Sequence, residues 1–256
     1  MKRGLVAALV LLAACSGGNG SSSSNTRTLT VFAASSLTGA FTQIGKQFDA
    51  AHPGVNVTFS FGPSDQLASQ IKSEGTADVF ASASETYLDQ VASSPGVADR
   101  LDFASNHLVI ITPPSNPAKI DRIQDLANPG VQLEIAAAGV PVGDYARQAL
   151  KTAGVSSGAL ANVVSNAQDD ASLVQAITTG SADAAIVYTS DVTKAIAPSV
   201  HVVQIPSVDN VTAVYPAAAI QGSPNIGLAQ QFVNYLDSNP GKATLTAFGF
   251  LPPPTH

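Results

Sequence analysis

A pattern of strand, serine and helix occurs twice near the start of this chain and limits how it can fold. Residues 28–41 read as a short apolar strand, a turn that holds Ser35 and Ser36, and a helix with apolar residues at helical spacing. Residues 55–61 form an alternating strand that leads through Ser64 into a second helix. Strands that alternate with helices favour parallel sheets with crossover helices. We therefore expect an α/β protein.

The same alternation continues along the chain and predicts two α/β lobes. Further strands are expected at residues 78–81, 107–112, 133–137, 163–166, 184–188, 202–205 and 211–220. The last of these is expected to be interrupted at Tyr215 and Pro216. Helices are expected between the strands, for example at residues 85–91 and 144–151. A proline-rich loop at residues 113–117 indicates the passage into the second lobe.

The serines at the helix starts allow two interpretations. A serine in this position usually caps its helix, because its hydroxyl accepts a hydrogen bond from a backbone N–H that has no partner within the helix. The alternative is an anion site. Free N–H groups, the positive end of the helix dipole and hydroxyl donors together attract an anion at the carboxyl end of a strand. The repetition at Ser36 and Ser64 favours a function.

The beginning of the chain resembles a bacterial lipoprotein signal. Two basic residues precede an apolar block at residues 5–14, which is too short to span a bilayer and ends directly before Cys15, the only cysteine. We therefore expect residues 1–14 to be a signal peptide and Cys15 to be the lipidated N-terminus. Residues 15–27 are then this cysteine and a flexible Ser- and Gly-rich tether.

Composition excludes some partners. The chain of 256 residues is 45% hydrophobic and only 12% charged, which fits well-buried lobes. Removal of residues 1–14 leaves ten Lys and Arg residues against 18 acidic residues, a net charge of −8. Nucleic acid and anionic membrane surfaces are therefore not expected as partners, apart from a membrane attachment through the lipid anchor.

Enzymatic and metal chemistry have weaker support. Ser69 and Lys72 match the Ser-x-x-Lys motif of penicillin-recognising acyl enzymes. Residues 151–153, Lys-Thr-Ala, differ by one residue from the companion Lys-Thr-Gly element and read as a helix end. A Ser-Asp-Asn element is absent from the sequence. A secreted serine acyl-enzyme therefore remains the less favoured alternative. The four histidines show no ligand spacing, so we expect neither a metal site nor a cofactor.

Five segments together resemble the molybdate-binding proteins of bacterial ABC importers. The segments are, in chain order, VFAASSLTGAF, SFGPSDQLASQI, ADVFASAS, VPVGDYARQAL and AAIVYTSD. The resemblance extends from Thr28 to Leu251. It implies a type II periplasmic-binding-protein fold, in which two lobes, each a mainly parallel sheet flanked by helices, close on a tetrahedral oxyanion. The first lobe would comprise residues 28–104 and 214–256, and the second residues 105–213.

The resemblance also implies the residues of the site. Ser36 and Ser64 would each contribute a hydroxyl and a backbone N–H from the first lobe. The second lobe would contribute the backbone N–H groups of Val142 and Asp170 and the hydroxyl of Tyr188. The expected ligand is molybdate, with tungstate as a second ligand and sulfate or phosphate as alternatives. The expected partner is the membrane permease of an ABC importer, and the protein is expected to be a monomer.

Asp170 conflicts with a site made of donors only. A carboxylate that points inward would repel a dianion or accept the proton of phosphate. An aspartate at such a place commonly turns away and caps its own helix. We expect Asp170 to give its backbone N–H to the ligand and to keep its carboxylate outside the cavity.

Overall fold

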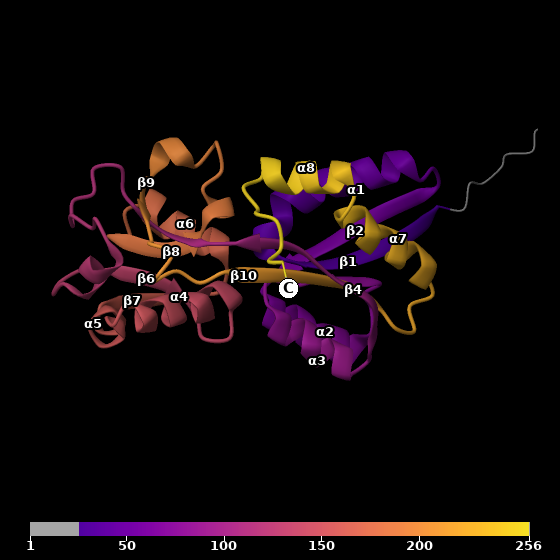
Figure 1. Ribbon diagram of the computed structural model, residues 1–256, viewed down its shortest axis with the longest axis horizontal. Helices are drawn as coiled ribbons and strands as arrows, with labels where there is room; N and C mark the ends of the chain where they lie inside the picture. Colours follow the sequence, from indigo (N-terminus) through magenta and orange to yellow (C-terminus); the bar gives the residue numbers. More distant parts are fainter. Residues whose placement is uncertain (1–25, 256) are drawn as a thin grey trace, which may run out of the picture.

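The chain forms two five-stranded sheets that lie one beside the other in an elongated molecule (Figure 1). The computed structural model describes residues 26–255, so the expected signal peptide, Cys15 and most of the tether lie outside the described residues. The strands of the first sheet are β1 (Arg27–Ala34), β2 (Val55–Gly62), β3 (Val79–Ala81), β4 (Val97–Asn106) and β10 (Ala213–Ile220). Those of the second are β5 (Leu108–Thr112), β6 (Leu133–Ala136), β7 (Val163–Ala167), β8 (Ala184–Tyr188) and β9 (His201–Gln204).

The two sheets share one topology. The strand order is β2-β1-β3-β10-β4 in the first sheet and β7-β6-β8-β5-β9 in the second. In the first sheet only β10 runs against the other strands, and in the second only β5 does so. Each sheet is therefore mainly parallel, and the predicted two-lobed α/β fold is confirmed.

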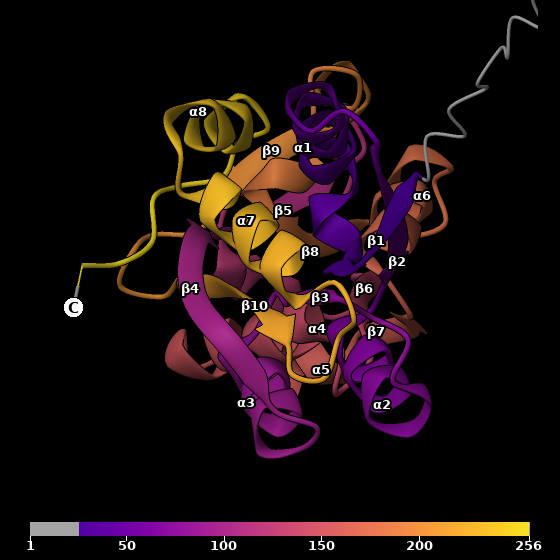
Figure 2. The same ribbon diagram turned by 90° about the vertical axis from the view of Figure 1, so that its right-hand side faces the viewer.

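Helices cover both faces of each sheet. They are α1 (Thr38–Ala51), α2 (Ser64–Glu74), α3 (Glu85–Ser93), α4 (Pro141–Thr152), α5 (Ser156–Ala161), α6 (Asp170–Thr178), α7 (Ile226–Leu236) and α8 (Asn239–Ala247). Short 3-10 turns are η1 (Ser35–Leu37), η2 (Ile123–Ala127), η3 (Thr189–Asp191) and η4 (Ala197–Ser199). Seen from the end of the molecule, α2 and α3 lie below the first sheet and α1 and α8 above it (Figure 2). Within residues 26–255 no helix combines the length and apolarity that a membrane span requires.

The alternation of side chains along β1 explains this layering. Leu29 and Val31 belong to the hydrophobic cluster that includes α1 and α7, whereas Phe32 belongs to a separate cluster with α2 and α3. Successive residues of a strand point to opposite faces, so a strand covered on both faces is apolar throughout. On the α1 side, the rings of Phe41 and Phe232 pack edge to face at 6.0 Å. This packing fixes the position of α1, and with it the start of the helix near Ser35.

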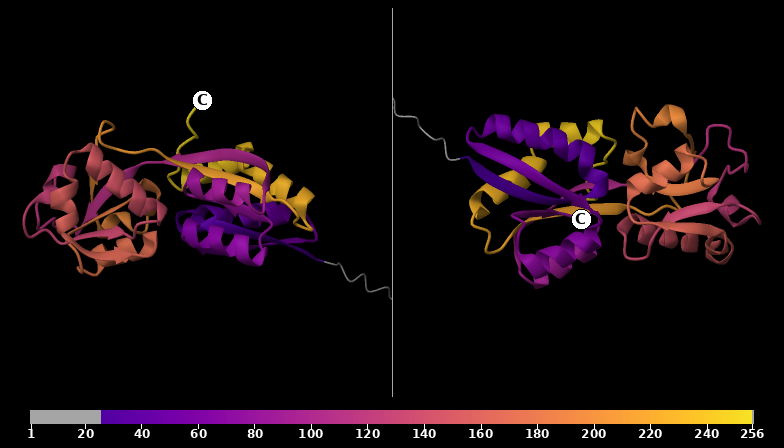
Figure 3. Two further views of the ribbon diagram at one scale, coloured as in Figure 1. Left: turned by 90° about the horizontal axis from the view of Figure 1, so that it is seen from below. Right: turned by 180° about the vertical axis from the view of Figure 1, so that it is seen from behind.

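The chain passes between the sheets twice, from β4 into β5 and from β9 into β10. Figure 3 shows these two segments joining the lobes. The strand β4 was not expected, because charged residues such as Asp99 and Arg100 hide its period. The expected interruption of β10 at Tyr215 and Pro216 is wrong. The strand is continuous, and a register shift against β4 accommodates the proline, which has no N–H to donate.

A substitution at Gly143 can test how closely α4 packs on its own sheet. A Cβ at this position would lie 2.4 Å from the carbonyl oxygen of Ala137 and 2.5 Å from that of Ala136, both of them backbone atoms. We expect Gly143→Ala to displace the start of α4 and to lower the free energy of unfolding by about 1 to 3 kcal/mol. Gly227 of α7 is the matched control, because a Cβ there meets no atom within 4 Å.

Gly227→Ala should leave the stability unchanged or raise it by up to about 1 kcal/mol, since alanine favours a helix over glycine. Urea denaturation of both variants and the wild type measures the difference. Equal midpoints for Gly143→Ala and the wild type would contradict the close packing described above.

Candidate functional site

A small cavity lies between the lobes, where the carboxyl ends of β1, β2, β6, β7 and β8 face one another. Its volume is about 10 Å³. All five sequence-predicted site residues line it, namely Ser36, Ser64, Val142, Asp170 and Tyr188. No lysine, arginine or histidine is among the described residues that line it. The cavity is thus surrounded by hydroxyls, helix starts and one carboxylate.

The first lobe contributes three serines, and the two predicted ligand contacts among them, Ser36 and Ser64, cap no helix. The residues at the capping positions of α1 and α2, Leu37 and Pro63, make no side-chain cap. The Ser36 hydroxyl lies 3.1 Å from the hydroxyl of Tyr215. Ser64, which is fully buried, accepts a hydrogen bond of 3.0 Å from the backbone N–H of Ala83. Since Ser64 Oγ is the acceptor in this bond, it keeps its own proton available for donation into the cavity.

The second lobe contributes two helix starts. Pro141 and Val142 are the first two residues of α4, and Asp170 is the first residue of α6. The first N–H groups of a helix have no acceptor within it, so that of Val142 is available to a ligand. The backbone N–H of Asp170 also has no acceptor in its helix, but it stabilises the ionised form of its own carboxylate. Proline at the first position leaves this pattern intact because its missing N–H would be unpaired in any case.

Tyr188 is the last residue of β8, and its hydroxyl is buried at the site. Its side chain is 1% exposed, and its hydroxyl has no hydrogen-bond partner among residues 26–255. Its ring packs edge to face against Tyr215 of the first lobe, with the centroids 5.9 Å apart. Burial raises the pKa of the Tyr188 hydroxyl well above its ordinary value, so the group stays protonated and uncharged and has a proton to donate to a ligand.

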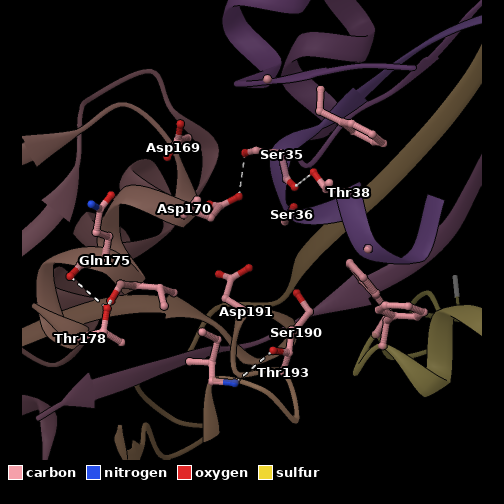
Figure 4. A pocket seen from close by; sticks show the side chains of 18 residues that line it. Ser35, Ser36, Thr38, Asp169, Asp170, Gln175, Thr178, Ser190, Asp191 and Thr193 are labelled. Carbon is pink, nitrogen blue, oxygen red and sulfur yellow. Dashed lines mark hydrogen bonds between the residues drawn. The ribbon is translucent and has the colours of Figure 1, made fainter. Parts of the chain in front are cut away.

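The Asp170 side chain does not behave as expected. Asp169 caps α6 by accepting a 2.8 Å hydrogen bond from the backbone N–H of Ser172. Asp170 instead reaches across the cleft, where its Oδ2 accepts a 2.8 Å hydrogen bond from the Ser35 hydroxyl (Figure 4). The expectation that Asp170 caps its own helix and turns away from the cleft is wrong. The capping position belongs to the residue before it, which frees Asp170 to bridge the lobes.

Burial sets the electrostatics of this carboxylate. Asp170 is only 7% exposed. Burial raises its pKa to about 6, and the charge of Asp169 adds to the rise, while hydrogen bonds from the Ser35 hydroxyl and from the backbone N–H groups of Asp170 and Ser36 oppose it. Burial and the charge of Asp170 also raise the pKa of Asp191 well above its ordinary value. Two acidic groups with raised pKa values therefore stand in the same cleft.

A larger chamber of about 610 Å³ adjoins the small cavity. The two spaces share Ser35, Ser36 and Asp170 in their walls. Residues from both lobes line the chamber, among them Phe61 and Asp191. Its walls combine apolar side chains with hydroxyls, one amide and the carboxylates of Asp169, Asp170 and Asp191.

Several cross-lobe contacts were not singled out as site features from the sequence. The Tyr87 hydroxyl of α3 donates to the carbonyl of Gly139 in the second lobe. Where the chain crosses from β4 to β5, the Asn106 side chain donates to the Ser190 hydroxyl at 2.7 Å. Ser35 was recognised at a helix start, but its partner Asp170 lies 135 residues away. Only the folded chain brings such pairs together.

The residues of the two less favoured chemistries lie elsewhere. Ser69 and Lys72 are both exposed on α2 and line a surface depression with Ser73 and Gln90. His52 stacks on Phe48 with the ring centroids 3.9 Å apart. No group of three or more His, Cys, Asp and Glu side chains in residues 26–255 is arranged to hold a metal ion.

Comparison with known proteins agrees with this geometry. Residues 29–251 match the family described as bacterial extracellular solute-binding protein. The chain is also similar to the molybdate-binding protein ModA of Mycobacterium tuberculosis, with 37% identity across 99% of this chain and 98% of the relative. This similarity confirms the resemblance to molybdate-binding proteins that the five segments indicate.

Solved structures agree in fold. The periplasmic molybdate-binding protein of Azotobacter vinelandii superposes with a TM-score of 0.76 at 23% identity, over 88% of this chain and 100% of that one. The sulfate-binding protein SubI of Mycobacterium tuberculosis gives 0.78 at 17% identity, over 88% and 87%. Because the family match covers most of the described residues and the sequence similarity extends over nearly the whole chain, this chain belongs to the bacterial extracellular solute-binding protein family.

Proposed function

We propose that this protein captures molybdate outside the cytoplasm and delivers it to the membrane permease of an ABC importer, with tungstate as a second ligand. The ligand is held between the lobe of residues 28–104 with 214–256 and the lobe of residues 105–213. Its contacts are Ser36, Ser64, Val142, Asp170 and Tyr188. The sequence similarity to a molybdate-binding protein supports this choice of ligand.

The observation that carries the proposal is the unpartnered hydroxyl of Tyr188. A buried polar group without a hydrogen bond is costly, at about 1 to 3 kcal/mol. Its position beside two helix starts and two serine hydroxyls indicates that a ligand with several acceptor oxygens completes its hydrogen bonding. A dianion held by neutral donors gains about 1.5 to 3 kcal/mol from each charge-assisted bond, so no lysine or arginine is required.

The same donors set the selectivity. A donor-only cavity leaves the O–H of a protonated anion unpaired, which disfavours monohydrogen phosphate. Sulfate is disfavoured more weakly, because it is smaller than molybdate. Asp170 is the exception among the lining residues, since its carboxylate is an acceptor. The acyl-enzyme alternative has less support, because Ser69 and Lys72 are exposed on the outside of α2.

Location and assembly follow from the same proposal. Family membership implies a place outside the cytoplasm. We further propose that lipid-modified Cys15 attaches the protein to the cell membrane and that the polar segment after it lets the lobes stand off the surface. In this form the protein works as a monomer that meets the permease.

Titration calorimetry with molybdate, tungstate, sulfate and phosphate tests the ligand. We expect molybdate and tungstate to bind at least about tenfold more tightly than sulfate or phosphate, a difference of about 1.4 kcal/mol or more. The titrations require buffers free of sulfate and phosphate. Tighter binding of sulfate or phosphate than of molybdate would replace the proposed ligand with that anion.

Tyr188→Phe isolates the hydroxyl that carries the proposal. This change removes one oxygen that has no partner in the ligand-free protein, so the free energy of unfolding should not fall. Molybdate binding should weaken by about 1.5 to 3 kcal/mol, because a charge-assisted hydrogen bond is lost. Titration calorimetry measures molybdate binding, with Tyr235→Phe as the control, whose hydroxyl donates to Gln47 away from the cleft. Urea denaturation measures the stability of both variants.

Tyr235→Phe should bind molybdate as the wild type does. If Tyr188→Phe also binds with unchanged affinity, Tyr188 is not a ligand contact and the site must be reassigned. A loss of stability in Tyr188→Phe would indicate instead that the hydroxyl has a structural partner.

Cys15→Ala tests the lipid anchor. The variant should remain unprocessed or be released from the membrane, because the residue that would carry the lipid is gone. Detergent phase partitioning of the wild type and the variant, expressed in a bacterium that processes lipoproteins, measures this difference. Wild-type protein in the aqueous phase would contradict lipidation at Cys15.

A further inference from the structure

The ionised Asp170 carboxylate already uses donors that a bound anion needs. It accepts the hydrogen bond of the Ser35 hydroxyl across the cleft, and the backbone N–H of Ser36 also stabilises its charged form. These groups lie at the start of the first-lobe helix, where the dipole favours a negative charge. Figure 4 shows the carboxylate pointing from α6 towards Ser35. In this structure Asp170 therefore acts as an internal anion.

The size of the cavity makes this arrangement incompatible with a bound oxyanion. A volume of about 10 Å³ holds roughly one water molecule, and a tetrahedral oxyanion has four oxygens. Asp170 lines this cavity and the adjoining chamber. An entering dianion must therefore push the carboxylate off its donors or lie against it, and both are unfavourable while Asp170 is charged.

We propose that Asp170 makes oxyanion capture proton-linked, so that the closed complex holds the dianion together with one proton on the Asp170 carboxyl group. The inference rests on the proposed function and assigns the side chain of Asp170 a role in specificity. In this binding step the dianion, the protein with ionised Asp170 and one proton combine. The only covalent bond that forms is the O–H bond of the Asp170 carboxyl group, and none breaks. The protonated carboxyl then becomes a further O–H donor to the ligand.

The surroundings of Asp170 favour uptake of the proton. The groups that face it are Asp169 at the start of its own helix, Asp191 on η3, Tyr188 on β8 and Tyr215 on β10. Burial raises the pKa values of both tyrosines, so neither contributes a charge below about pH 10. No lysine, arginine or histidine lines either space among the described residues. The charge of a bound dianion beside the buried carboxylate therefore strongly favours protonation of Asp170.

The sign of the pH dependence follows from linkage. Burial raises the pKa of Asp170 to about 6, and a dianion bound beside it raises this pKa further. Affinity for molybdate is therefore highest below about pH 6 and falls by about tenfold per pH unit above it, until the pKa of the complex is reached. Monohydrogen phosphate carries its own proton and can donate it to ionised Asp170. Its binding needs no uptake, so the preference for molybdate over phosphate shrinks as the pH rises.

Calorimetric titration with molybdate between about pH 6.5 and pH 8.5 tests the inference. The wild type should lose affinity by about tenfold per unit and take up close to one proton per molybdate, as measured in two buffers of different ionisation enthalpy. Asp170→Asn should bind with little pH dependence and exceed the wild type by about tenfold or more near pH 8. Asp169→Asn, a neutral cap of equal quality on the same helix, should keep the slope.

The outcomes separate two failures. A wild type that binds no molybdate at any pH contradicts the proposed function. A wild type that binds molybdate with constant affinity and no proton uptake contradicts only the role of Asp170. A slope that survives in Asp170→Asn and disappears in Asp191→Asn places the proton on Asp191 and overturns the assignment. If Asp170→Asn does not fold, the proton count of the wild type still decides whether the binding is proton-linked.

Discussion

Unpaired backbone N–H groups at helix starts are the feature on which the cleft depends. β1 and β2 lead into the first-lobe helices that begin near Ser36 and Ser64, and β6 and β7 lead into those that begin near Val142 and Asp170. The first turn of a helix cannot satisfy its own donors. Because the carboxyl ends of these strands face one another across the cleft, the donors of four helices are collected around one cavity. An anion can accept the hydrogen bonds that these backbone donors cannot make within their own helices.

The tyrosines at the cleft have a second role, because they join the hydrophobic cores of the two lobes. Tyr188 packs between Tyr145 and Tyr215, and Tyr215 continues the contact to Phe103 and Phe250 of the first lobe. Tyr188 and Tyr215 in this row of rings are buried. A hydrogen bond from the Tyr188 hydroxyl is stronger in such surroundings than in water, and its absence is also more costly.

Asp170 shows how a single residue can modify a site made of neutral donors. The carboxylate joins the lobes, since it accepts a hydrogen bond from the Ser35 hydroxyl across the cleft. The same burial that strengthens this contact raises the pKa of the group to about 6. At a pH near its pKa, a buried carboxylate that gains one proton changes from a hydrogen-bond acceptor into a donor. The site is thereby tuned by protonation as well as by shape.

The sequence by itself determined the fold class and the residues that lead into the cavity. Alternating strands and helices have strong periodicity, and Ser36, Ser64, Val142 and Asp170 each follow a strand at a helix start, which is a local property. Tyr188 came only from the resemblance, because a buried tyrosine at a strand end is usually a core residue. The tertiary structure decided the rest: the charged strand β4, the Tyr188 hydroxyl left without a partner, and the bond from Ser35 to Asp170. These features depend on strand pairing, burial and side-chain orientation between distant parts of the chain, and Ser35 and Asp170 are 135 residues apart. A local sequence pattern does not indicate which distant side chains come into contact.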